Sequence, residues 1–129
     1  MAHPNEQVVR DGFSAFAAMD TEALRKIIAP DAAWHVGGRS PLTGSYKGVD
    51  EILAFFGRTM ELSGGTFAID LHDVAGNDEH VFAAYAVSAQ REGKTLRDTA
   101  VLVFHVTGGQ VTEAWTVAGD QYRSDEFWS

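Results

Sequence analysis

The chain of 129 residues is long enough for one domain and too short for two ordinary ones. Its composition, 45% apolar and 22% charged, is typical of a globular domain and excludes disordered and low-complexity classes. A net charge of −8 argues against nucleic acid or an anionic membrane as a partner. Cysteine is absent, which excludes disulfides, thiolate nucleophiles and Cys-ligated metals and favours a cytoplasmic location.

The first third of the chain predicts two helices. Apolar residues at three- and four-residue spacing give the first helix one apolar face, and Pro4 suits its first turn; the face comprises Val8, Val9, Phe13, Phe16 and Ala17. Asp20 or Thr21 then caps a short helix that extends through Ile28 and ends at residues 29–31. Neither the start of the chain nor any apolar run predicts a signal peptide or a membrane span.

A short strand and a third helix follow. Residues 32–36 predict the strand, and the Gly-, Pro- and Ser-rich residues 37–45 predict a loop. The third helix is expected from about Val49 to Leu62, with a broad apolar stripe, and residues 63–65 end it.

After residue 65 the apolar period changes from 3.6 to 2, which predicts a run of strands. These are expected at residues 66–74, 80–90, 95–106 and 111–118, joined by tight turns. The tail, residues 120–129, is polar but ends in Phe127 and Trp128, so we expect it to pack against the domain. Helices separated from a run of hairpin strands indicate an α+β fold, with the helices over one face of a mainly antiparallel sheet. A strongly curved sheet of this kind would enclose a cavity suited to a small apolar ligand.

The order of elements and several motifs resemble the SnoaL-like branch of the nuclear transport factor two-like superfamily, to which ketosteroid isomerases are related. The resemblance covers essentially all of residues 1–129 as a single domain, and rests on four segments: residues 13–16, 31–36, 41–56 and 109–115, with Asp120 five residues later. It implies a cone-shaped α+β barrel of the cystatin-like type, with about three N-terminal helices on a strongly curved, mixed but mostly antiparallel sheet. It also implies a homodimer and an enzyme that works without a cofactor.

The steroid isomerase pattern itself is not matched. The resemblance would place the catalytic Asp of those enzymes just after the start of the first strand, where this chain has His35 and Val36. The Asp that stabilises the enolate would fall at Ala100, although Asp98 lies two residues earlier on the same face of the strand. The sequence therefore argues against a Δ5-3-ketosteroid isomerase.

Three residues are candidates for acid/base catalysis. Asp98 lies within a strand, where Asp is disfavoured, and would serve as a base if it faced the cavity; an exposed strand start paired with Arg91 or Lys94 is the alternative. His35 can change charge near neutral pH, or can be a half-buried structural histidine. The resemblance places Asp120 near the position of the general base in the SnoaL cyclases; a turn or helix-capping carboxylate is the alternative.

Four aromatic residues are candidates for the wall of a ligand site, with ordinary core packing as the alternative: Trp34, Tyr46, Tyr85 and Trp115. No histidine is spaced from a carboxylate or another histidine as metal ligands are, so no metal site is predicted.

Two classes of function follow. The first is a small-molecule enzyme of the isomerase or polyketide cyclase type that acts on an apolar, carbonyl-bearing ligand. The second is a non-catalytic ligand-binding or dimerising domain. An epoxide hydrolase ranks third, because Arg97 and Asp98 supply only half of the Asp–Arg–Asp arrangement that those relatives use.

Overall fold

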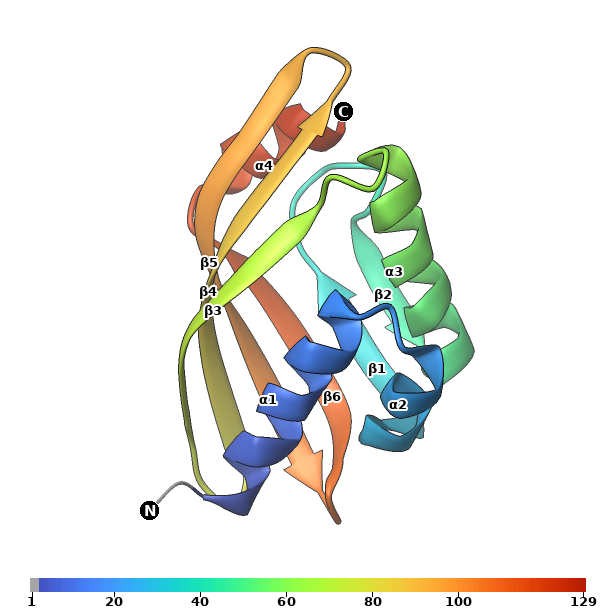
Figure 1. Cartoon of the computed structure of the whole chain (residues 1–129), viewed down its shortest axis with the longest axis vertical. Helices are drawn as coiled ribbons and strands as arrows, with labels where there is room; N and C mark the ends of the chain where they lie inside the picture. Colours follow the sequence, from blue (N-terminus) through green and yellow to red (C-terminus); the bar gives the residue numbers. More distant parts are fainter. Residues whose placement is uncertain (1–2) are drawn as a thin grey trace.

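One six-stranded sheet forms the frame of the molecule (Figure 1). The computed structural model describes residues 3–129. The strands are β1 (Ile28–Val36), β2 (Gly44–Lys47), β3 (Ala68–Gly76), β4 (His80–Arg91), β5 (Lys94–Thr107) and β6 (Gln110–Ala118). Their order in the sheet is β2-β1-β6-β5-β4-β3, and all neighbours are antiparallel except β1 and β6, which are parallel. The predicted α+β class with a mixed, mostly antiparallel sheet is thereby confirmed.

Three helices cover the inner face of this sheet: α1 (Pro4–Ala17), α2 (Thr21–Ile27) and α3 (Val49–Leu62). Asp20 caps α2 by accepting a hydrogen bond from the N–H of Ala23 at 3.1 Å. The predicted helices therefore form, but α2 ends one residue earlier than predicted. Ile28 has extended backbone and begins β1, which is longer than the predicted residues 32–36.

Two elements were not predicted. Residues 44–47 form the short strand β2, which pairs with β1 and takes in the last two residues of the predicted loop 37–45. The polar tail forms a fourth helix, α4 (Gln121–Trp128), whose N-cap is Asp120. Phe127 and Trp128 are buried there with Leu42, Ala89 and Leu96, so the expected packing of the tail is confirmed.

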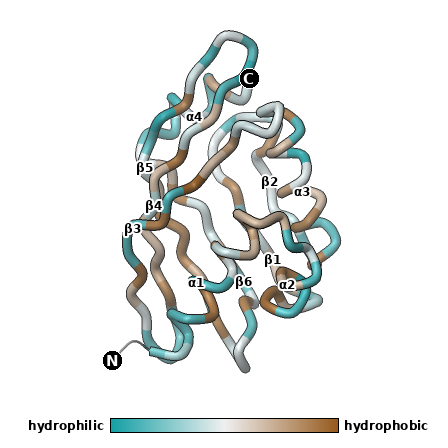
Figure 2. The backbone as a smooth tube through the Cα atoms, in the orientation of Figure 1, coloured by the Kyte–Doolittle hydropathy of each residue, from teal (hydrophilic) through white to brown (hydrophobic). Residues whose placement is uncertain are grey.

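The main core lies between the helices and the inner face of the sheet. Alternation along the central strands places one set of side chains inward, and the innermost include Val81, Ala83 and Ala114. Ile52 of α3 is fully buried against them. Hydrophobic residues follow the middle of the strands, while the turns at both ends of the molecule are hydrophilic (Figure 2).

Candidate functional site

A cavity of about 180 Å³ lies between the helices and the inner face of the sheet. Its wall is largely apolar and includes Val9, Phe13, Phe16, Phe56, Leu102 and Phe104. An engineered cavity of roughly 150 Å³ in another protein holds benzene, so this volume suits one or two small rings. Few polar side chains reach this space, and they define what a ligand would meet.

Asp98 is the carboxylate of the cavity. Residues 96, 98, 100, 102 and 104 of β5 all line it, because alternate residues of a strand share a face. The Asp98 side chain is only 12% exposed. Its Oδ2 accepts a hydrogen bond from the N–H of Asp120 at 2.9 Å, and its Oδ1 accepts one from the N–H of Thr99 at 2.8 Å. Each carboxylate oxygen can accept a further bond, so Asp98 retains capacity to take up a proton or bind a donor.

Tyr85 brings a hydroxyl group to the same cavity. It is buried on β4 opposite Ala100, and its ring packs edge-to-face on Phe13 with the centroids 5.5 Å apart. Burial raises the pKa of Tyr85 far above its usual value, because the phenolate would be poorly solvated. Within residues 3–129 no hydrogen bond satisfies its hydroxyl. The cavity therefore contains a neutral hydroxyl donor that is free to bind a ligand.

Trp34 forms another part of the cavity wall. Its ring packs edge-to-face with Phe56 and Phe104, at centroid distances of 5.1 and 5.8 Å. The indole Nε1–H is buried and has no hydrogen-bond partner among the described residues. A buried polar group left without a partner costs about 1–3 kcal/mol, so an acceptor on a ligand would relieve that cost.

His35 and Trp115 lie on the opposite face of the sheet. Trp34 points inward, so its neighbour His35 points outward. The Nδ1 of His35 is 2.8 Å from Ser45 Oγ and its Nε2 is 2.7 Å from Glu113 Oε2, while its ring stacks on Trp115. The structure therefore does not bring His35 and Asp98 together, and neither His35 nor Trp115 lines the cavity.

Asp120 and Tyr46 also lie outside the cavity lining. Asp120 Oδ1 caps α4 by accepting from the N–H of Arg123 at 3.1 Å. Tyr46 donates its hydroxyl to the carbonyl oxygen of Leu42 at 2.6 Å and stacks on Phe55. Both contacts match the structural alternatives expected for these residues.

Helix α4 supplies polar residues that the sequence analysis missed. Gln121 and Ser124 line the cavity together with Trp128. Arg123 lies between two carboxylates, with nitrogen–oxygen distances of 3.9 Å to Asp98 and 3.8 Å to Asp120. The spacing of Gln121, Ser124 and Trp128, after the capping Asp120, is the helical signal that could have identified them.

The fold and this site define a class: an α+β protein with helices over the inner face of a mixed sheet and an apolar cavity between the two. Residues 9–114 match the SnoaL-like domain, and the chain belongs to that family. No helix within residues 3–129 is long and apolar enough to cross a membrane.

Several known proteins are similar along nearly the whole chain. An uncharacterised protein of Mycobacterium tuberculosis is 35% identical over 123 residues, covering 95% of this chain and 94% of the relative. The solved structure of Bal32a, from a soil-derived mobile gene cassette, is 36% identical with a TM-score of 0.95, and the match covers 99% of this chain and 98% of the other. IdmH of Streptomyces antibioticus, described as a candidate polyketide cyclase, is 19% identical with a TM-score of 0.76, covering 91% and 93% of the two chains. That last likeness concerns the fold alone.

Proposed function

We propose that this SnoaL-like protein is a small-molecule enzyme of the isomerase or cyclase type, acting on an apolar, carbonyl-bearing ligand of one or two rings. The observation that carries the proposal is the inward-facing carboxylate of Asp98 in an apolar cavity that also holds the unpaired hydroxyl of Tyr85. The chemistry needs a base and a hydrogen-bond donor but no cofactor. The absence of cysteine is consistent with a reaction that takes place in the cytoplasm.

The roles follow from the chemistry of each group. Asp98 accepts a proton from the carbon next to the ligand carbonyl, and the electron pair of that C–H bond moves to the carbonyl oxygen. Tyr85 donates a hydrogen bond to this oxygen as it becomes an enolate, and Trp34 supplies a second donor. Return of the proton to another carbon completes an isomerisation; attack of the enolate carbon on a second carbonyl of the ligand forms a ring. IdmH, which shares this fold, is itself described as a candidate polyketide cyclase.

Exchange of solvent deuterium into cyclic ketones tests the proposal. Cyclohexanone, 2-cyclohexenone and 1-tetralone would be incubated with the protein in D2O, and loss of the α-proton signals followed by NMR. We expect Asp98→Asn to lower the exchange rate about 10²–10⁴-fold, and Tyr85→Phe about 10²-fold or more. Asn keeps the shape of the side chain and one oxygen for the Asp120 N–H, so α4 should remain docked. His35→Asn, on the outer face, is the matched control and should change nothing.

An exchange rate that is the same in Asp98→Asn and the wild type would refute the role of Asp98. Ketones that bind to the cavity but are not exchanged by the wild type would favour the second class of function, a ligand-binding domain without catalysis.

A second reaction, epoxide hydrolysis, is favoured by the position of Arg123. Its guanidinium lies between Asp98 and Asp120, so Asp120, considered above only as a base, is the second Asp beside an arginine. Asp98 would accept a proton from water as the water oxygen attacks an epoxide carbon, and the opened oxygen would take up the proton. Arg123→Gln separates the two reactions, because it should abolish hydrolysis of cyclohexene oxide, whereas ketone exchange should persist at an altered rate since Arg123 is paired with Asp98.

We also propose that two copies of the chain associate through the outer face of the sheet. Phe82 and Val117 lie on this face and are 46% and 52% exposed. Trp115 lies in the same cross-strand row as Phe82 and two residues before Val117 on β6. Exposed apolar side chains that share one face are typical of protein interfaces. We expect light scattering after gel filtration to give twice the mass of the chain. The Val117→Lys variant should have the mass of a single chain, whereas Tyr122→Lys on α4 should keep the doubled mass.

A further inference from the structure

Two histidines face one another on the outer face of the sheet. His80 of β4 and His105 of β5 are direct partners across the two strands, and their Nε2 atoms are 3.0 Å apart. In a hydrogen bond between the two rings, one of these nitrogens carries the hydrogen and the other accepts it. The two Nε2 atoms therefore converge on one point beside the sheet.

Neighbouring aromatic rings hold both imidazoles in place. The His105 ring packs edge-to-face on Trp115 with the centroids 4.9 Å apart, and the His80 ring lies parallel to Phe82 at 6.1 Å. Because the rings are fixed by packing, little side-chain freedom would be lost when both nitrogens bind a third atom.

The second nitrogen of His105 faces a carboxylate. His105 Nδ1 lies 3.9 Å from Glu113 Oε1, and the other oxygen of Glu113 binds His35. At 3.9 Å the contact is too long for a hydrogen bond, so Glu113 places a negative charge near the pair while its hydrogen bond goes to His35.

The distance between the two Nε2 atoms selects among metals. Metal–imidazole bonds are about 2.0–2.1 Å long, so two nitrogens 3.0 Å apart would subtend roughly 91–97° at the metal. That angle is the one between neighbouring ligands in tetragonal Cu(II) and Ni(II) complexes, and it is narrower than tetrahedral zinc prefers. Copper also heads the affinity series of divalent first-row metals.

We propose that His80 and His105 form a chelating site for a divalent transition-metal ion, with Cu²⁺ bound tightest and water in the remaining positions. Among residues 3–129 no group of three or more His, Cys, Asp or Glu side chains could hold a metal ion, so the site is a two-histidine chelate for an exchangeable ion. His105 is 40% exposed in the single chain, which gives an ion access there, and the net charge of −8 attracts cations to the chain. The pair borders Phe82 and Trp115 of the proposed contact between two copies, so metal binding and the pairing of copies compete. The site is separate from the cavity and does not rest on the proposed catalytic function.

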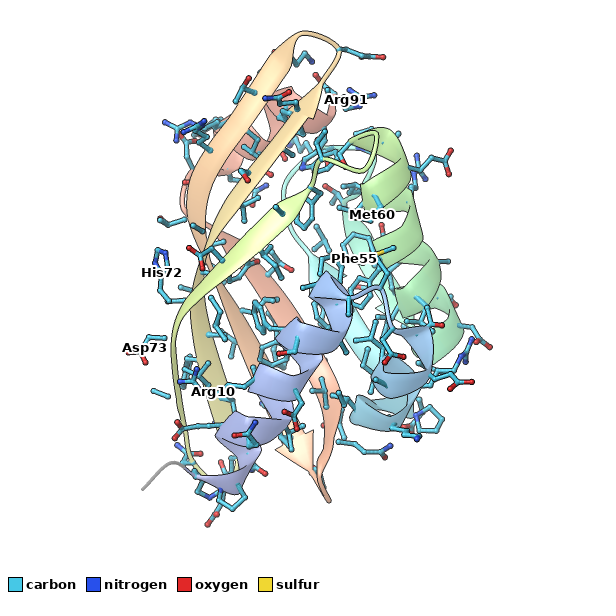
Figure 3. All side chains as sticks on the ribbon, viewed as in Figure 1. Arg10, Phe55, Met60, His72, Asp73 and Arg91 are labelled. Atoms are coloured by element: carbon cyan, nitrogen blue, oxygen red, sulfur yellow. The ribbon has the colours of Figure 1, made fainter. Side chains whose placement is uncertain are left out.

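Electron paramagnetic resonance of the untagged protein with one equivalent of Cu²⁺ at pH 7.5 tests the site. Every variant would carry His3→Asn, because a histidine close to the amino terminus can itself bind copper, and Asn retains the capping of α1. We expect a tetragonal spectrum with hyperfine splitting from two imidazole nitrogens. His80→Asn or His105→Asn should weaken copper binding at least tenfold. His72→Asn should not, because His72 projects outward from β3 (Figure 3) beside the carboxylate of Asp70, 3.9 Å away, and not beside a second imidazole.

A second measurement leaves His80 and His105 unsubstituted. In long-range ¹H–¹⁵N NMR spectra of the His3→Asn protein, Zn²⁺ should shift the Nε2 signals of His80 and His105 together and leave His72 in place. Copper binding that survives both His80→Asn and His105→Asn would overturn the proposal. So would zinc shifts spread evenly over all the histidines, which would indicate adventitious surface binding.

Discussion

The two tyrosines considered as ligand contacts differ in the hydrogen bonding of their hydroxyl groups. The hydroxyl of Tyr46 donates to the carbonyl oxygen of Leu42 at 2.6 Å, whereas the hydroxyl of Tyr85 has no partner among residues 3–129. A hydrogen bond of this kind contributes about 0.5–1.5 kcal/mol to stability. The hydroxyl of Tyr85, which lines the cavity, adds no such bond in the free protein and is available to a ligand.

Matched Tyr→Phe variants separate these two roles. Tyr46→Phe should lower the free energy of unfolding by about 0.5–1.5 kcal/mol, because a hydrogen bond is lost. Tyr85→Phe should leave it unchanged or raise it, because only an unpaired hydroxyl is removed. Urea unfolding followed by tryptophan fluorescence measures both values. An equal loss in the two variants would show that Tyr85 has a structural partner.

Among the elements, α4 is the one that completes the cavity, and polar contacts hold both of its ends. Asp98 and Asp120 bind the N–H groups at its beginning. At its end, Arg91 Nη1 donates to the carbonyl oxygen of Ser129 at 2.7 Å, and Lys94 Nζ donates to that of Glu126 at 2.9 Å. Arg91 can be seen beside the end of this helix in Figure 3. Cations at the carbonyl end of a helix also interact favourably with its dipole.

The apolar face of α4 should account for most of its docking energy. Phe127 is 2% exposed and Tyr122 is 90% exposed in the same helix. Phe127→Ala should destabilise the protein by about 3–5 kcal/mol, the usual cost of emptying a buried Phe site. Tyr122→Ala should change stability by less than about 0.5 kcal/mol. Guanidinium unfolding compares the two, and similar losses would mean that α4 is not held by its buried face.

The elements that the sequence predicted are those with a long, regular apolar period. The strands β3 to β6 have nine to fourteen residues each and alternate clearly. β2 has four residues inside a Gly-rich stretch, and α4 has eight mostly polar residues. Such short segments are stabilised by packing against distant parts of the chain, which a local pattern does not contain.

Which side chains face the cavity could be predicted only where a strand alternates without a bulge. The pairing of β4 with β5 runs without a bulge from Lys94 to His105, so Asp98 shares the inward face of Leu102 as the alternation predicts. For the neighbours Trp34 and His35 either residue could have faced inward, since both occur in half-buried positions. Their placement is set by the two strands that flank β1 in space: β2, which is adjacent in sequence, and β6, which is distant.

At the scale of the whole molecule, burial of Tyr85 links stability to alkaline pH. In the unfolded chain Tyr85 loses its proton near pH 10, whereas in the folded protein burial raises its pKa well above that value. Above pH 10 the unfolded state therefore binds fewer protons than the folded state. Its contribution to stability is fully present below pH 10 and falls as the pH rises.

The free energy of unfolding should decline above pH 10 by about 1.4 kcal/mol per pH unit for this one proton. Tyr46 adds to the decline, because burial also raises its pKa while Arg58 opposes the shift. Tyr85→Phe should show a shallower slope than the wild type, which urea unfolding at pH 9, 10 and 11 would measure. Parallel slopes would contradict the burial of this hydroxyl as the cause.

The parallel pair of β1 and β6 also constrains the order in which the chain can fold. β6 is the last strand along the chain, yet it lies between β1 and β5 near the middle of the sheet. Until residues 110–118 have been synthesised, the β2–β1 ribbon and the β3–β5 meander have no strand to join them. The nascent chain therefore exposes two unfinished sheet edges during translation, and closes the cavity only after its final strand has left the ribosome.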